Sequence, residues 1–144
     1  LARKQSVNIV CGEQIVALTL LPLTFRRLID VNFALQSEEL GQALSRPTPM
    51  NIAKIAYCLL DENSLQLIDQ FKIEVNGELE ESNPMHKLFC MMCENNLNDG
   101  FTNYTSVLNA VSRAAAESLP ECQDKKKALR LLNPFKMNLK RFLT

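Results

Sequence analysis

The sequence centres on Asn83-Pro84-Met85-His86-Lys87-Leu88-Phe89-Cys90-Met91-Met92-Cys93-Glu94-Asn95-Asn96-Leu97, its most apolar helix candidate. Asn83 can cap the start of this helix, and Pro84 suits the first helical position. Apolar side chains recur at helical spacing, at Met85, Leu88, Phe89 and Met92. The segment also holds the one histidine and two of the five cysteines of the chain. Any metal or catalytic site is therefore expected to involve this helix.

Composition indicates one globular domain. The chain has 144 residues, of which 47% are hydrophobic, and a chain of this length can bury a core without disulfides or metal. Lys+Arg and Asp+Glu both number 16, so no overall field steers the chain to nucleic acid, which is an unlikely partner on these grounds. The absence of tryptophan argues against an aromatic platform for single-stranded nucleic acid or sugars.

Cysteine usage and hydropathy bear on location. The five cysteines are an odd number, and no secretory signal is recognised after the basic first residues. We therefore expect thiols in a reducing cytoplasm. The apolar run from Ile15 to Leu23 is far too short to cross a bilayer, so no membrane association is expected.

The N-terminal part is predicted to form a β-hairpin over about residues 5–20. Gln5 to Cys11 alternates weakly between apolar and polar residues, Gly12-Glu13 interrupts it, and Gln14 to Leu20 is rich in strand formers. An isolated hairpin is only marginally stable, so its apolar side must pack on helices.

Helical patterns follow the hairpin. Thr24 is predicted to cap a helix to about Leu35, and a short capped helix follows from Ser37 to about Leu44. Thr48 and Pro49 predict the start of a third helix, whose apolar residues on almost every side indicate a buried position.

The rest of the chain carries further helices. We expect a helix over about Ser64–Phe71, then an extended piece with a hairpin-type turn at Asn76-Gly77. After the central helix, Asn98-Asp99-Gly100 is predicted as a break, and Thr102 or Asn103 as the cap of a last helix. The predicted fold is mainly α, a compact helical domain of five to six helices with a small N-terminal β-hairpin. It comprises residues 1–120, followed by a basic C-terminal arm at 121–144.

His86, Cys90 and Cys93 are spaced so that one helical face could present all three. Thiolate and imidazole are ligands that zinc prefers, but a tetrahedral site needs a fourth ligand, such as Cys58, Cys122 or a carboxylate. The alternative interpretation is that the two cysteines are small core residues and His86 lies at the surface. A small metal- or thiol-dependent protein that uses His86, Cys90 and Cys93 is thus an alternative, although no metal ligand is predicted.

Enzymatic activity is not expected. Only four glycines occur, and none forms a phosphate-binding loop. No strained nucleophile turn adjoins Cys90 or His86. We therefore predict no catalytic residues and no cofactor.

The C-terminal arm mixes lysines with large apolar residues. Lys125-Lys126-Lys127 could contact phosphates, but interspersed leucines and phenylalanines favour docking on a protein surface. Helix packing or docking is therefore preferred to nucleic-acid binding.

The order of features over residues 5–117 resembles the tail assembly chaperones of long-tailed bacteriophages. The matching features are the N-terminal hairpin, the segment Leu23-Thr24-Phe25-Arg26-Arg27-Leu28-Ile29-Asp30 opening a first helix, and the Pro49-led apolar helix. The resemblance implies a non-enzymatic protein in the host cytoplasm. Its partner would be the tape-measure protein or another tail protein, which it binds and keeps soluble during tail assembly.

A chaperone of this kind would hold an apolar helical segment in a groove. The apolar residues expected to line it are Phe25, Phe33, Met85, Phe89, Met92 and Leu97, for which the alternative is simply the hydrophobic core. The other functional hypothesis is a virion structural subunit of the tail or neck, a homo-oligomeric ring formed through the hairpin edge and the C-terminal arm.

Overall fold

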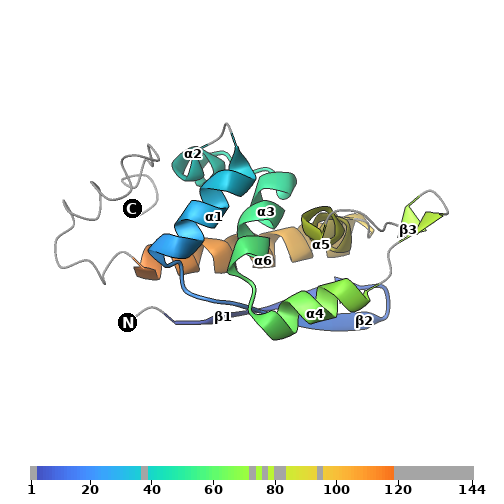
Figure 1. Ribbon diagram of the computed structural model, residues 1–144. Coiled ribbons are helices and arrows are strands. Elements are labelled where there is room, and N and C mark those ends of the chain that lie inside the picture. The colour runs from blue at the N-terminus through green and yellow to red at the C-terminus, as the bar shows by residue number, and fades with distance from the viewer. Residues whose placement is uncertain are drawn as a thin grey trace.

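The computed structural model describes residues 3–36, 39–71, 74–75, 78–79, 84–93 and 96–118, with the backbone alone for 74–75 and 78–79. Within these residues the chain forms six helices and two small antiparallel hairpins (Figure 1). The mainly helical class with an N-terminal hairpin is confirmed. The predicted C-terminal arm and the predicted turn at Asn76-Gly77 lie outside the described residues.

The elements have the following bounds. The strands are β1 (Gln5–Cys11), β2 (Gln14–Leu20), β3 (Glu74–Val75) and β4 (Glu78–Leu79). The helices are α1 (Phe25–Leu35), α2 (Leu40–Ser45), α3 (Pro49–Leu59), α4 (Glu62–Gln70), α5 (Pro84–Cys93) and α6 (Leu97–Ser118).

The N-terminal hairpin has one buried and one exposed face. Strands β1 and β2 pair in register, with Val7 opposite Leu18 and Ile9 opposite Val16. These four side chains are buried, whereas the residues between them are mostly exposed. The alternation places one apolar face against the helices, as expected for a hairpin that cannot be stable alone.

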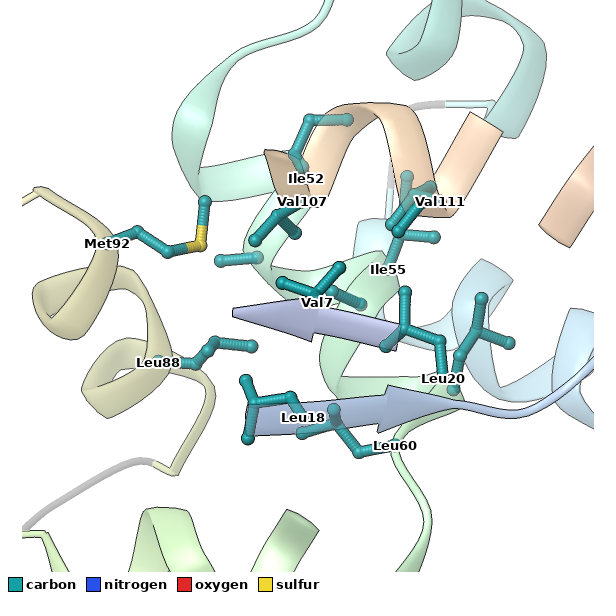
Figure 2. Packing of buried hydrophobic residues seen from close by; sticks show 14 of the residues in the cluster. Val7, Leu18, Leu20, Ile52, Ile55, Leu60, Leu88, Met92, Val107 and Val111 are labelled. Atoms are coloured by element: carbon teal, nitrogen blue, oxygen red, sulfur yellow. The ribbon is translucent and has the colours of Figure 1, made fainter. Parts of the chain in front are cut away.

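The core lies between this hairpin face and helices α3, α5 and α6 (Figure 1). Figure 2 shows Leu88 and Met92 of α5 extending towards the strands, beside Val107 of α6 and Ile52 of α3. α1 packs on α3, so α3 is covered on several sides. This accounts for the five buried side chains of α3 and confirms the predicted buried helix.

Local capping signals begin α1 and α3 as the sequence predicts. The Thr24 side chain accepts a hydrogen bond from the Arg27 backbone N–H, and the Thr48 side chain accepts one from Asn51. Pro49 occupies the first turn of α3, where its missing N–H leaves no helical hydrogen bond unmade.

The outer edge of β2 is covered by the connection between α3 and α4. The Leu21 N–H donates to the carbonyl of Leu59, and the Asp61 N–H donates to the carbonyl of Thr19 at 3.0 Å. The Thr19 N–H in turn donates to the Ser64 hydroxyl at 2.8 Å. Ser64 is 2% exposed, so this hydroxyl satisfies a strand N–H that helix α4 removes from solvent.

The outer edge of β1 meets α6. Asn103 is fully buried, and its side chain bonds both backbone groups of Val10. At the opposite end of β1, Glu117 accepts from the guanidinium of Arg3 at 2.7 Å and from the Gln5 amide at 2.9 Å. α6 thus runs along β1 in the opposite direction and closes this edge at both ends.

One predicted helix start is shifted and another is wrong. The helix expected over about Ser64–Phe71 is α4, which begins slightly earlier, at Glu62, because Asp61 is the cap and accepts from the Ser64 N–H at 2.9 Å. The predicted break at Asn98-Asp99-Gly100 lies inside α6, which begins at Leu97. The Asn96 side chain caps this start by accepting from the Asp99 N–H at 2.9 Å.

Gly100 lies where the last turn of α5 comes close to the first turn of α6. A Cβ placed there would meet the carbonyl oxygen of Met92 at 3.7 Å and that of Cys93 at 3.8 Å. These are ordinary van der Waals distances, so the crossing would also accommodate an alanine.

Candidate functional site

An open groove of about 680 Å³ lies where α1, α3, α4 and α5 approach one another. Apolar side chains form much of its wall, namely Phe33, Ala34, Leu60, Leu65 and Met85. Asp30 and Lys54 supply its charged groups. An open apolar groove with a few polar groups is a typical place for a partner to bind.

The α1 side of the groove carries an exposed aromatic ring. Phe33 is 77% exposed, although it is a large apolar residue. Phe25, at the start of the same helix, is 59% exposed, and the partly exposed Ile29 lies between them at four-residue spacing. The three residues, which we call the α1 stripe, form one apolar strip along the helix that ends at the groove.

The electrostatics of the groove do not favour thiol chemistry. Burial raises the pKa of the Cys58 thiol to about 11, and the nearby Asp30 carboxylate contributes to the rise. Burial and the charge of Asp69 raise the pKa of Tyr57. Both groups therefore stay protonated near neutral pH and act as weak polar contacts in a mostly apolar wall.

One end of the groove is formed by a strained backbone. Gln36, the C-cap of α1, has φ 58° and ψ −105°, a conformation that non-glycine residues seldom adopt. Its N–H still donates to the Asn32 carbonyl at 3.1 Å and so closes the helix. Gln36 is therefore a strained residue at the C-terminal end of α1.

The six residues expected to line a groove have different positions. Phe33 and Met85 are brought together there, although they are far apart in sequence. Phe25 is exposed at the other end of the α1 stripe, and Leu97 is 91% exposed at the start of α6. Phe89 is partly buried, packs against the core and stacks on the His86 ring.

The position of Met92 differs from the one expected from the sequence. Its side chain is fully buried and points from α5 into the core, close to the hairpin (Figure 2). The expectation that Met92 lines a surface groove is therefore wrong. Seven residues are nearly two helical turns, so Met85 and Met92 project from about the same side of α5. They differ because the elements packed around the C-terminal part of α5 bury Met92, whereas Met85, at the N-terminal end, lines the groove.

His86 and Cys90 lie in contact, one helical turn apart on α5. The Cys90 sulfur lies 3.9 Å from Nδ1 and 4.0 Å from Nε2 of His86, and Cys90 is 2% exposed. Among the described side chains, no group of three or more His, Cys, Asp or Glu residues could hold a metal ion. Cys58 belongs to the groove instead, and the other proposed ligand, Cys122, lies outside the described residues.

Sequence reasoning missed the α3 contribution to the groove. Helix α3 is predicted as buried, yet Lys54, Tyr57 and Cys58 line the groove. Lys54 and Tyr57 are spaced three residues apart, which places them on one side of the helix. This polar pair in an otherwise apolar helix was the signal that one side remains open. Phe101 of α6, 69% exposed, was also not predicted.

Across the described ranges, no helix has the length and apolar character needed to span a membrane. Comparisons with protein-family models, with curated proteins and with solved structures found no match for this chain.

Proposed function

We propose that this protein is a non-enzymatic chaperone that binds an apolar helical segment of another protein in the groove between α1, α3 and α5. The observation that carries the proposal is the exposure of Phe33, 77%, directly beside a groove that Met85 also lines. In keeping with the resemblance to phage tail assembly chaperones, the proposed client is the tape-measure protein, held soluble in the host cytoplasm.

The α1 stripe exposes two aromatic rings, those of Phe25 and Phe33, to solvent. Large contiguous apolar patches on a soluble domain mark interaction sites. A helix that docks in a groove does so through apolar side chains at three- and four-residue spacing. The α1 stripe has this spacing, and Met85 adds a flexible, polarizable side chain that can adapt to different client residues.

The alternative of a ring-forming virion subunit loses one of its two proposed contacts, the hairpin edge. A ring assembled through the hairpin needs an open strand edge. Asn103 occupies the β1 edge at Val10, and the α3–α4 connection occupies the β2 edge at Thr19. Such a ring would have to form through helical surfaces or the C-terminal arm instead.

A matched pair of substitutions tests the proposal. The chain would be co-expressed with the products of neighbouring genes and purified by affinity, and the mass of each complex would be measured. Phe33→Asp should abolish recovery of a long helical client in the soluble fraction. Phe101→Asp changes a similarly exposed phenylalanine outside the groove and should leave recovery unchanged.

Two results would refute this function. The first is recovery of the same client by both variants at the wild-type level, which would remove the groove from binding. The second is a closed homo-oligomer together with tail or neck proteins and no helical client, which would support the structural-subunit alternative. Far-UV circular dichroism of both variants verifies that neither substitution at these exposed positions disturbs the fold.

A further inference from the structure

The end of α6 lies beside the start of the α1 stripe. Ser118, the last residue of α6, accepts a hydrogen bond from the Leu23 N–H at 3.1 Å. Leu23 precedes Phe25 by two residues, and Figure 1 shows the two helix ends side by side. The chain therefore leaves the described domain at the exposed end of the α1 stripe.

The following residues are long enough to reach the groove. Helix α1 has 11 residues, which corresponds to about 16 Å at 1.5 Å per residue. The C-terminal arm, residues 121–144, would span about 36 Å at the same rise. A tethered segment also has an effective concentration of the order of millimolar at sites within its reach.

The arm has the composition that this surface needs. Its large apolar side chains are Leu129, Leu131, Leu132, Phe135, Met137, Leu139, Phe142 and Leu143. It carries seven basic and two acidic residues, whereas residues 1–120 carry nine basic and 14 acidic ones. The two parts therefore attract each other at low salt.

The charges at the surface itself are mixed. Asp30 lies on the groove, but Lys54 also lines it and Arg26 is exposed at the start of α1. Apolar contact with the α1 stripe must therefore provide most of the binding, and the opposite net charges help to bring the arm close.

We infer that the C-terminal arm binds in cis to the α1 stripe and the groove, and that a client must displace it. The arm would then shield Phe25 and Phe33 until a client with a better apolar helix competes for the same surface. The competition with a client rests on the proposed function, whereas contact between the arm and the stripe does not.

A tryptophan reporter tests the contact without any client. The chain contains no tryptophan, so Phe33→Trp in the full chain places one tryptophan, whose fluorescence can be excited selectively, at the groove. We expect blue-shifted emission and weak acrylamide quenching. Adding Leu131→Ser and Leu132→Ser in the arm should shift the emission to the red and raise the quenching constant several-fold. Phe101→Trp provides a control reporter whose quenching should not respond to the arm.

Concentration and salt separate the remaining outcomes. Quenching of the Phe33→Trp reporter should be independent of protein concentration and should increase at high salt. Equal, strong quenching with and without the arm substitutions would overturn the inference. Protection of the reporter from quenching that disappears on dilution would also overturn it, because the arm would then come from a second copy.

Lys125→Glu with Lys126→Glu is an independent arm variant and should also increase quenching of the Phe33→Trp reporter.

Discussion

The Asn103 side chain pairs with the backbone of Val10 as another strand would. Its Nδ2 donates to the Val10 carbonyl at 2.8 Å, and its Oδ1 accepts from the Val10 N–H at 2.9 Å. Asn103 is fully buried, so these two bonds replace the water that would otherwise solvate the strand edge.

Replacing Asn103 should strongly destabilise the fold. Asn103→Ala leaves the N–H and carbonyl of Val10 buried without these partners, and each costs about 1–3 kcal/mol. We expect a loss of roughly 2–4 kcal/mol in the free energy of unfolding, measured by urea denaturation. Asn109→Ala, at an exposed position of the same helix, should change stability by less than about 0.5 kcal/mol. Equal midpoints for the two variants would contradict the role of Asn103.

The two methionines of α5 should differ in their effect on stability. Met92→Ala creates a cavity in the core and is expected to cost about 2–5 kcal/mol. Met85→Ala removes a partly exposed side chain from the groove wall and should cost distinctly less. Thermal or chemical unfolding of both variants measures the difference. A larger cost at Met85 would contradict the burial of Met92 in the core.

Asp61 should make helix α4 sensitive to acid. Hydrogen bonds from the Ser64 side chain and backbone lower the pKa of the Asp61 carboxyl. The folded state therefore binds this proton less readily than the unfolded state, whose pKa is about 3.9. The stabilisation is present above that value and is lost as the pH falls through the lower folded-state pKa.

The test is to measure the free energy of unfolding of Asp61→Ala and of the wild type as a function of pH. At neutral pH the variant should lose about 1 kcal/mol, as expected for a helix cap. The difference should shrink steadily below about pH 4. Asn63→Ala, in the exposed first turn of α4, provides a control without this pH dependence. A difference that stays constant down to pH 2 would exclude a role for the carboxylate charge.

Cys58 should react slowly with alkylating reagents in the folded protein. Because its pKa is raised to about 11, only about 0.1% is thiolate at pH 8, and the thiolate is the nucleophile. Iodoacetamide labelling followed by peptide mass mapping should show modification many-fold slower than in urea. Labelling should accelerate as the pH rises towards 11. Rapid labelling at pH 7 would show that Cys58 is an activated thiol and would revive the thiol-dependent alternative.

Elements with local signals were predictable from the sequence. The hairpin follows from the alternation on either side of Gly12, which takes φ 61° in the turn. Thr24 and the pair Thr48-Pro49 begin α1 and α3 because capping depends on residues within one helical turn. The mainly helical class follows from the same short-range patterns.

The start of α6 was not predictable in this way. Gly100 indicates a helix end when only its neighbours are considered. In the folded chain Asn96 provides an earlier cap by accepting from the Asp99 N–H. The helix therefore begins before Gly100 and continues through it, despite the intrinsic cost of glycine in a helix.

The sequence by itself determined where the hairpin and most helices form, since hydrophobic periodicity and capping act over a few residues. Only the tertiary structure decided that Met92 is buried while Phe33 is exposed, and that Phe33 meets Met85 at one groove. Both phenylalanine and methionine suit a core equally well. Their position depends on which neighbouring element covers them, and that is set by the packing of segments distant in the chain.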